Sequence, residues 1–251
     1  MGKLQAVRTA LPRGLVKGHS IPSVEREPAS ARRDDMRRRK HDPALAQVIT
    51  VFLAAVEIKD RYTYGHSLRL AGYAVALAEE MSLPKQQVED VRQGALLHDI
   101  GNLFIGERIL QKPDELSEDE FEAVKQHAAI GAAVVSKVKG LEDVAMIVRH
   151  HHERFDGSGY PDGLADDRIP LGARVVTVVD AFGAMIEERP YRKMLTMEEA
   201  LAELERGAGG QFDPRVAEVF ARLARERATG WPMAHDGNVL LAEVVIDGTL
   251  T

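Results

Sequence analysis

The stretch HHERFDGSGYPDGLADDRIPLGARVVTVVDAF, residues 151–182, decides how this chain folds. An apolar helical segment ends in the pair His151-His152, and a loop rich in glycine follows. The chain then enters a segment in which apolar residues cover nearly every side of a helix, with Asp180 inside it. Ionisable groups in such surroundings carry a desolvation cost unless something compensates them, so we expect a functional site here.

Outward from this stretch, further potential metal ligands follow one another along the chain. They are His66, the pair His98-Asp99 in GALLHDIGN (94–102), and His127. A single histidine is most often an ordinary core or surface residue, but that reading explains the whole series poorly. Imidazole and carboxylate are common ligands of transition metals, and a cation would also hold the histidines neutral. The series therefore predicts a metal site, and its two adjacent pairs can supply two centres.

Helix start signals and apolar periodicity predict an all-α core. Helices are expected over 43–59 and 66–81, from Pro84 to His98, after the capping boxes Ser117/Glu120 and Thr196/Glu199, and after Asp213-Pro214. Few segments before residue 236 alternate like strands, although tertiary contacts could hide a short hairpin in the 154–170 loop.

The composition indicates one globular domain, which we place at residues 42–228, with an appendage at each end. The chain has 251 residues, of which 45% are hydrophobic. It has no cysteine, which excludes disulfides and thiolate metal sites and suits a reducing cytoplasm. No apolar run approaches the roughly 18–20 residues that span a bilayer, and no signal peptide is evident. We therefore expect a cytoplasmic protein without a membrane span.

The two appendages differ in character. Residues 1–40 carry eleven Lys or Arg against four Asp or Glu, although the whole chain has a net charge of −6. We expect residues 1–41 to be a disordered basic tail that does not bind nucleic acid, because no aromatic residue is interleaved to stack on bases. Residues 229–251 are rich in β-branched residues and contain an Asp-Gly turn signal. A short hairpin, a dimer contact and the stub of a further domain all fit them.

Taken together, these motifs resemble the HD-GYP group of the HD metal-dependent phosphohydrolase superfamily. His98-Asp99 matches the superfamily signature, and Gly159-Tyr160-Pro161 matches the motif that names the group. Further matches are DRYTYGHS (60–67), ILQKPDELSEDE (109–120), RPYR (189–192) and GGQFDP (209–214). The resemblance runs from about residue 44 to about residue 225.

The resemblance implies a fold, an activity and partners. It implies a helical bundle of the HD-domain type that holds two or three metal ions, usually iron or manganese. Such proteins hydrolyse cyclic di-GMP to pGpG, GMP or both, and a metal-bridging hydroxide is the expected nucleophile. Some members are reported to prefer other cyclic dinucleotides, and some have lost activity. The GYP loop is linked to docking with diguanylate cyclase domains, and domains of this kind often form homodimers.

The resemblance also implies roles for individual residues. Asp99 would be the bridging carboxylate, with His66, His98 and Asp180 on one metal and His127, His151 and His152 on the other. Substrate contacts are expected from Tyr160, Arg189 and Arg192, since guanidinium groups suit phosphate and guanine edges. The arginines could equally be solvated residues at a helix end, and the glycines of the GYP loop could simply shape a turn.

Three positions depart from the family pattern. Asn102 stands where a lysine commonly reaches the substrate phosphate, Gly183 stands where aspartate is common, and Tyr62 stands where three-metal members carry glutamate. We therefore expect two divalent transition metals, with His98, Asp99 and Asn102 as the catalytic residues. Without the positive charge of that lysine, hydrolysis of the phosphodiester could be roughly a hundredfold slower. The alternatives are an active phosphodiesterase, or an attenuated member that binds a cyclic nucleotide or a protein. An HD nucleotidase would leave the GYP segment unexplained.

Overall fold

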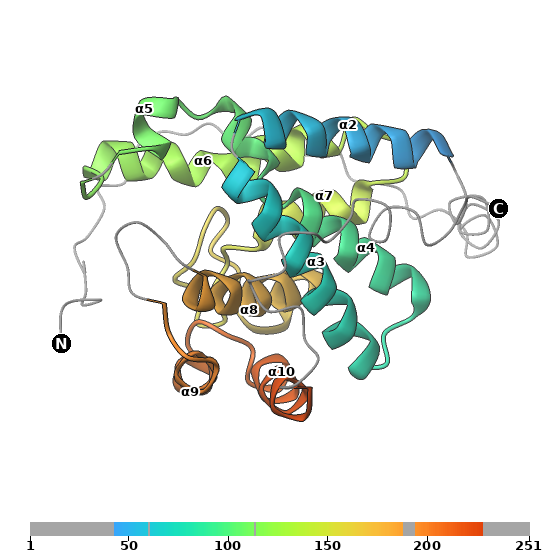
Figure 1. Ribbon diagram of the computed structural model, residues 1–251, viewed down its shortest axis with the longest axis vertical. Helices are drawn as coiled ribbons and strands as arrows, with labels where there is room; N and C mark the ends of the chain where they lie inside the picture. The colour runs from blue at the N-terminus through green and yellow to red at the C-terminus, as the bar shows by residue number, and fades with distance from the viewer. Residues whose placement is uncertain (1–42, 60, 113, 188–193, 228–251) are drawn as a thin grey trace. The chain divides into compact units, whose positions relative to one another are not determined.

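The computed structural model describes residues 43–59, 61–112, 114–187 and 194–227 (Figure 1). Apart from one isolated bridge between Ala208 and Phe212, the regular elements in these ranges are helices, which confirms the expected all-α fold. They are α2 (Pro43–Lys59), α3 (Arg61–Glu80), α4 (Lys85–Leu97), the 3₁₀ helix η1 (Ile100–Phe104), α5 (Glu107–Leu110), α6 (Glu118–Val135), α7 (Glu142–His150), the 3₁₀ helix η2 (Asp166–Arg168), α8 (Leu171–Ile186), α9 (Met197–Gly207) and α10 (Pro214–Glu226).

Local capping signals set several of these helix starts. The Ser117 side chain accepts from the Glu120 N–H, and the Glu120 carboxylate accepts from the Ser117 N–H at 2.8 Å. The expected second capping box, Thr196 with Glu199, forms in the same way before α9. Asp213 accepts from two backbone N–H groups at the start of α10. The structure confirms these predictions. They could be made from the sequence because each cap depends only on residues within three positions of one another.

Three expectations differ from the structure or lie beyond it. Helix α3 begins at Arg61 rather than His66, because its first residues carry no apolar period that the sequence could reveal. The loop over 154–170 contains the single turn of η2 and no hairpin. The proposed tails, 1–41 and 229–251, lie outside the described residues, so the domain boundaries stay predictions.

Helix α8 lies at the centre of the described bundle (Figure 1). Val175, Val176, Val178 and Val179 are fully buried, as expected for a helix that is apolar on nearly every side. The helix contacts α3, α4, α7, α9 and α10. Phe182 packs edge-to-face on Tyr73 of α3 and Phe220 of α10, with ring centroids 5.7 and 4.9 Å apart. Asp180 is therefore held on a buried helix that packs against five other helices of the described chain.

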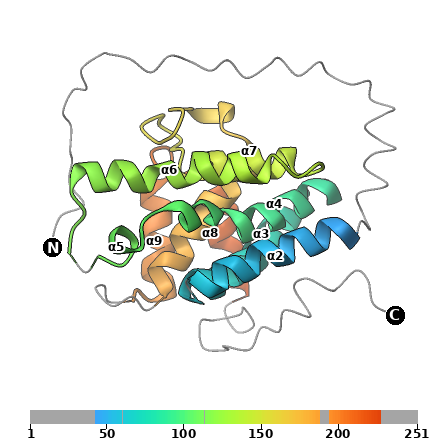
Figure 2. The same cartoon turned by 90° about the horizontal axis from the view of Figure 1, so that it is seen from above.

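The short helix η1 follows the His-Asp pair and is fixed from two sides. It contacts α2 and α6, which lie on different sides of the bundle in Figure 2, α6 toward the top and α2 toward the bottom. The Lys59 ammonium at the end of α2 donates to the carbonyls of Asn102, Leu103 and Ile105 at 2.7–2.9 Å. Within the described residues, no helix is both long enough and apolar enough to cross a membrane.

Candidate metal centre

Seven potential metal ligands converge on one place in the bundle. They are the seven residues of the predicted series: His66, His98, Asp99, His127, His151, His152 and Asp180. The four histidines at positions 66, 98, 127 and 151 are buried, whereas the Asp99 and Asp180 side chains are 23% and 22% exposed. The centre is therefore enclosed by imidazoles and reaches solvent beside its two carboxylates.

The first group of donors joins three helices. The Asp180 Oδ1 of α8 lies 3.0 Å from His66 Nε2 of α3 and 3.9 Å from His98 Nε2 at the end of α4. All three candidate ligand atoms lie within 4.8 Å of one another. That separation allows one cation to contact all three.

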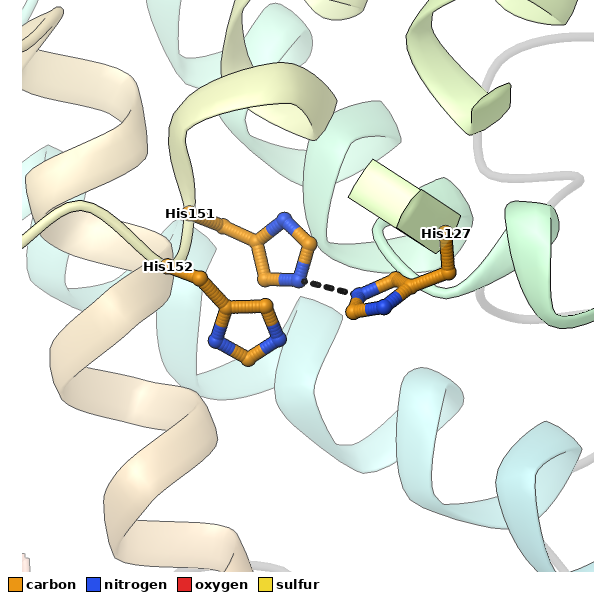
Figure 3. Close-up of side chains that lie close together, drawn as sticks. All are labelled: His127, His151 and His152. Carbon is orange, nitrogen blue, oxygen red and sulfur yellow. Dashed lines mark hydrogen bonds between the residues drawn. The ribbon is translucent and has the colours of Figure 1, made fainter. Parts of the chain in front are cut away.

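The second group consists of three imidazoles, shown in Figure 3. His127 of α6 and His151 at the end of α7 place their Nε2 atoms 3.4 Å apart, and His152 completes the group. The rings of His151 and His152 lie 4.0 Å apart between centroids. Two imidazole nitrogens this close repel one another if both are protonated, whereas a shared cation makes the arrangement favourable.

Asp99 lies between the two groups and faces both. Its Oδ2 is 3.3 Å from His98 Nε2 in the first group, and its Oδ1 is 3.5 Å from His127 Nε2 in the second. A carboxylate with one oxygen toward each group has the placement of a bridging ligand between two metals.

Backbone hydrogen bonds orient three of the imidazoles. The Nδ1 of each of His98, His127 and His151 lies 2.7–2.8 Å from the carbonyl three residues earlier in the chain. A carbonyl only accepts, so Nδ1 carries a proton, and in the neutral form of each ring the Nε2 lone pair faces the centre. Each ring is held in the tautomer that a metal ligand needs.

The electrostatics of the group favour a bound cation. Burial lowers the pKa of His152 to about 4, and burial together with neighbouring histidines lowers the pKa of His151 well below its usual range. Burial also opposes the charge on His98, but Asp99 and Asp180 outweigh it and raise the pKa of His98 to about 9. The pKa of Asp99 lies well below its usual range despite desolvation, because the surrounding histidines favour the carboxylate. A cation that displaced the His98 proton would satisfy both carboxylates.

The donor set suits transition metals. Each group of three donors offers imidazole nitrogens, carboxylate oxygens or both, and the chain has no thiolate. Iron, manganese, nickel and zinc all accept such ligands. The residues present therefore fit one metal in each group, with Asp99 between them.

The loop after His152 is fixed by side chains of its own segment. Glu153 is buried and accepts from the backbone N–H groups of Asp162 and Leu164 at 2.7 and 3.1 Å. Arg149 donates twice to the Asp162 carboxylate, and His150 Nε2 lies 3.0 Å from it. His150, Glu153 and Asp162 thus form a third group of potential ligands, but these loop contacts already engage it.

The glycines of the loop have a structural role, one of the two readings that the sequence left open. Gly157 has a φ of +79°, which favours glycine. A Cβ at Gly159 would lie 2.3 Å from the backbone nitrogen of Arg154, so no side chain fits there. The GGQFDP motif supports the same loop, because the carbonyls of Gly210 and Gln211 accept from Asp156 and Phe155.

The predicted catalytic and substrate residues lie at different places. Tyr160 packs against the His152 ring with centroids 4.9 Å apart, at the edge of the second group. Asn102 is partly buried in η1, three residues after Asp99. Arg189 and Arg192 lie outside the described residues.

Two residues near the centre escaped the sequence analysis. Thr177 donates to the carbonyl of His151 at 2.7 Å and so holds the end of α7 against α8. Glu187, at the end of α8, contacts the Nδ1 of His66 at 2.8 Å. Its position seven residues after Asp180 is the one signal in the sequence, because residues seven apart share a helix face.

Comparison with known proteins agrees with this architecture. The HD domain family model matches residues 50–216. A cyclic di-GMP phosphodiesterase of Thermotoga maritima is 38% identical over 189 residues, which cover 74% of this chain and 51% of that protein. A 3′3′-cGAMP-specific phosphodiesterase of Vibrio cholerae is also 38% identical, over 73% of this chain and 39% of its own length. The chain thus spans about half or less of these curated relatives.

Among solved structures, the fold is similar to that of a cyclic GMP-AMP specific phosphodiesterase from Vibrio cholerae. The TM-score is 0.58 at 20% sequence identity, and the match covers 73% of this chain and 49% of the other. At that identity the similarity concerns the fold.

Proposed function

Because this chain belongs to the HD domain family, and within it to the HD-GYP group, we propose that it is a metal-dependent phosphodiesterase that hydrolyses cyclic di-GMP to pGpG, GMP or both. The observation that carries the proposal is the placement of Asp99, with one carboxylate oxygen toward each of two groups of three donors. A mononucleotide phosphohydrolase would not explain why the GYP loop is fixed beside His152.

Different side chains of the centre would hold the two metal ions. His66, His98 and Asp180 would hold one divalent ion and His127, His151 and His152 the other, with Asp99 shared. Bound ions of this kind supply an activated water at neutral pH and neutralise phosphate charge. The backbone bonds to Nδ1 keep the ligand nitrogens aimed at the centre, which limits reorganisation during the reaction. The partly exposed side at Asp99 and Asp180 is where a scissile phosphate would enter.

We assign two ions rather than three, with iron or manganese preferred. The donor set described above supports one ion in each group. Tyr62, in place of the glutamate of three-metal members, supports the smaller number.

Substrate contacts and partners follow the family pattern in this proposal. Tyr160 would order or contact the substrate from beside His152, while Arg189 and Arg192 would bind phosphate or a guanine edge. A homodimer and a diguanylate cyclase domain at the GYP loop are the proposed protein partners. We place the chain in the cytoplasm, where cyclic dinucleotide signalling operates.

One observation favours a second function. Asn102 occupies η1 close to Asp99 and brings no positive charge to the phosphate. If that charge is essential, the chain would bind a cyclic nucleotide or a partner protein and turn over slowly.

Hydrolysis of cyclic di-GMP by anaerobically purified protein loaded with iron or manganese tests the proposal. Chromatography of the products separates pGpG from GMP, and 3′3′-cGAMP serves as the competing substrate. The His98→Ala/Asp99→Ala double variant is the control and is expected to lose turnover. No turnover by protein that holds its metals would favour the binding function instead.

A further inference from the structure

The histidine His66 is oriented differently from its neighbours in the centre. His98, His127 and His151 each bond a backbone carbonyl through Nδ1, whereas the Nδ1 of His66 contacts the Oε2 of Glu187 at 2.8 Å. The opposite ring nitrogen, Nε2, lies 3.0 Å from Asp180. His66 is therefore held between two carboxylates of α8, one in the ligand group and one behind it.

Glu187 is fixed in this position from its other side. Its side chain is only 4% exposed, and Arg69 donates to its Oε1 at 2.7 Å. Arg69 lies on α3, three residues after His66, so the same helix supplies both partners of the carboxylate. A carboxylate held by an arginine keeps its charge and its direction when it accepts from an imidazole.

Gly183 provides the space for this arrangement. A Cβ at position 183 would lie 2.7 Å from Leu70 Cδ1 and 3.1 Å from His66 Cε1, so a side chain there would press on the imidazole. Residue 187 lies one helical turn further along the same face of α8, and its N–H donates to the Gly183 carbonyl. A carboxylate at position 187 therefore reaches His66 Nδ1 without pressing on the imidazole ring.

We propose that Glu187 is the residue that positions His66 for metal binding. Gly183 leaves the space that the His66 ring needs for this contact, so the missing aspartate at position 183 does not weaken the site. Glu187 fixes the ring and its tautomer from behind, and so increases the affinity of the metal held by His66, His98 and Asp180. This inference rests on the metal centre proposed above. It removes Gly183 from the departures that would weaken the enzyme.

Metal affinity, measured without substrate, tests this role. Manganese would be titrated calorimetrically into metal-free wild-type protein and the Glu187→Gln and Glu187→Ala variants under anaerobic conditions. Loss of a partner behind a ligating histidine typically costs about 10–100-fold in metal affinity. We expect a loss of that size at one of two sites in Glu187→Ala and a smaller loss in Glu187→Gln, whose amide oxygen can still accept from His66.

The control is a carboxylate in a similar environment but away from the ligands. Asp213 is buried, pairs with Arg174 at 2.6 Å, and accepts from backbone N–H groups. Asp213→Asn should lower the unfolding temperature of the metal-free protein yet leave the metal-induced rise in that temperature unchanged. Glu187→Gln should reduce the rise itself, because the rise reports metal affinity for the folded chain.

A third variant separates the two readings of Gly183. If the site were weakened because Gly183 replaces the aspartate common in the family, Gly183→Asp would strengthen metal binding. Under our inference Gly183→Asp weakens metal binding, because the added side chain displaces His66 while Glu187 remains. Wild-type affinity in Glu187→Ala, or stronger binding in Gly183→Asp, would overturn the inference. Wild-type protein that binds no manganese or iron would instead overturn the metal centre itself, and the inference with it.

Discussion

At the scale of single residues, Asp99 carries the largest consequence because its two carboxylate oxygens face different groups of donors. Its neighbours His98 and His127 come from different helices and approach opposite oxygens. Asp180, by contrast, contacts the first group through one oxygen: its Oδ1 lies 3.0 Å from His66 Nε2 and 3.9 Å from His98 Nε2. The two aspartates of the predicted series are therefore not equivalent.

Asp99→Asn is expected to lower the metal content from about two ions per chain to fewer than one, because an amide offers one acceptor atom instead of two. Elemental analysis after gel filtration would measure the content. Asp167→Asn is the control, since the Asp167 side chain is 92% exposed and pairs with Arg174, away from the donors. Two ions retained by Asp99→Asn would show that the carboxylate does not bridge.

Asn102→Lys is expected to raise cyclic di-GMP turnover by up to about a hundredfold, because a cation near the transferred phosphate stabilises the transition state. Lys59 already binds the backbone carbonyl of residue 102, so the substitution leaves the course of η1 intact. Steady-state kinetics would measure the effect, with Asn102→Gln as the uncharged control. Equal turnover in both variants would mean that the natural site works without this lysine.

At the scale of elements, close contact between η1 and α6 places Asp99 beside His127. A Cβ at Gly101 would lie 1.9 Å from the His127 carbonyl oxygen and 2.9 Å from the Gly131 nitrogen. Both are backbone atoms, which cannot move aside as a side chain can. The glycine after the His-Asp pair is therefore required by packing.

Gly101→Ala should reduce the free energy of unfolding by about 3 kcal/mol, at the upper end of overpacking costs, and should also weaken metal binding. Urea unfolding followed by circular dichroism would measure the first effect. Gly106→Ala is the matched control, because a Cβ there meets nothing within 4 Å and its φ is −60°. A Gly101→Ala variant as stable as this control would contradict the packing argument.

The contacts of Asp162 hold the GYP loop to the end of α7. Hydrogen bonds from Arg149 are the main reason that the pKa of Asp162 is lowered from 3.8. Because the folded-state pKa is depressed, the stabilisation is present above the unfolded value and is lost as the pH falls through the folded value. Asp162→Asn at neutral pH should likewise speed amide hydrogen exchange in residues 154–168, whereas Asp167→Asn should not. Unchanged exchange in Asp162→Asn would show that the loop is fixed without Asp162, by the contacts of Glu153 and by the carbonyls of Gly210 and Gln211.

Sequence reasoning succeeded where the signal was local or periodic. The capping boxes and the uniformly apolar α8 could be predicted from residues a few positions apart, and the ordered series predicted which histidines meet. Glu187 was not predicted, because its one signal, the spacing of seven from Asp180, is weaker than the impression of a solvated, charged helix end that Glu188 and Arg189 give. Only the packing of α3 against α8 buries it against His66. The same holds for Lys59, whose partners lie more than forty residues away.

At the scale of the whole molecule, the donors link α3, α4, α6, α7 and α8 into one unit. Metal that binds only the folded chain stabilises it by mass action, about 2.7 kcal/mol at a hundredfold excess over the dissociation constant. For a chain of this size we expect the unfolding temperature to rise by about 5–10 °C with manganese and to fall again with a chelator. Calorimetric scans would measure it, and the His98→Ala/Asp99→Ala variant should show no rise. If neither manganese nor the chelator changed the unfolding temperature of the wild-type protein, the idea that a bound metal joins the helices would be contradicted.

The separation of His66 and Asp180 by 114 residues has a consequence for the synthesis of the protein on the ribosome. Ribosomes add about 5–20 residues per second, so Asp180 is made roughly 6–23 seconds after His66. Until α8 has emerged and docked, the first group of donors lacks Asp180 and is incomplete. An ion held by His66, His98 and Asp180 would then reach a chain that has already folded, through the side where Asp99 and Asp180 meet water. The supply of a divalent metal after translation, rather than the folding of the polypeptide, would set how much of the protein holds a complete centre.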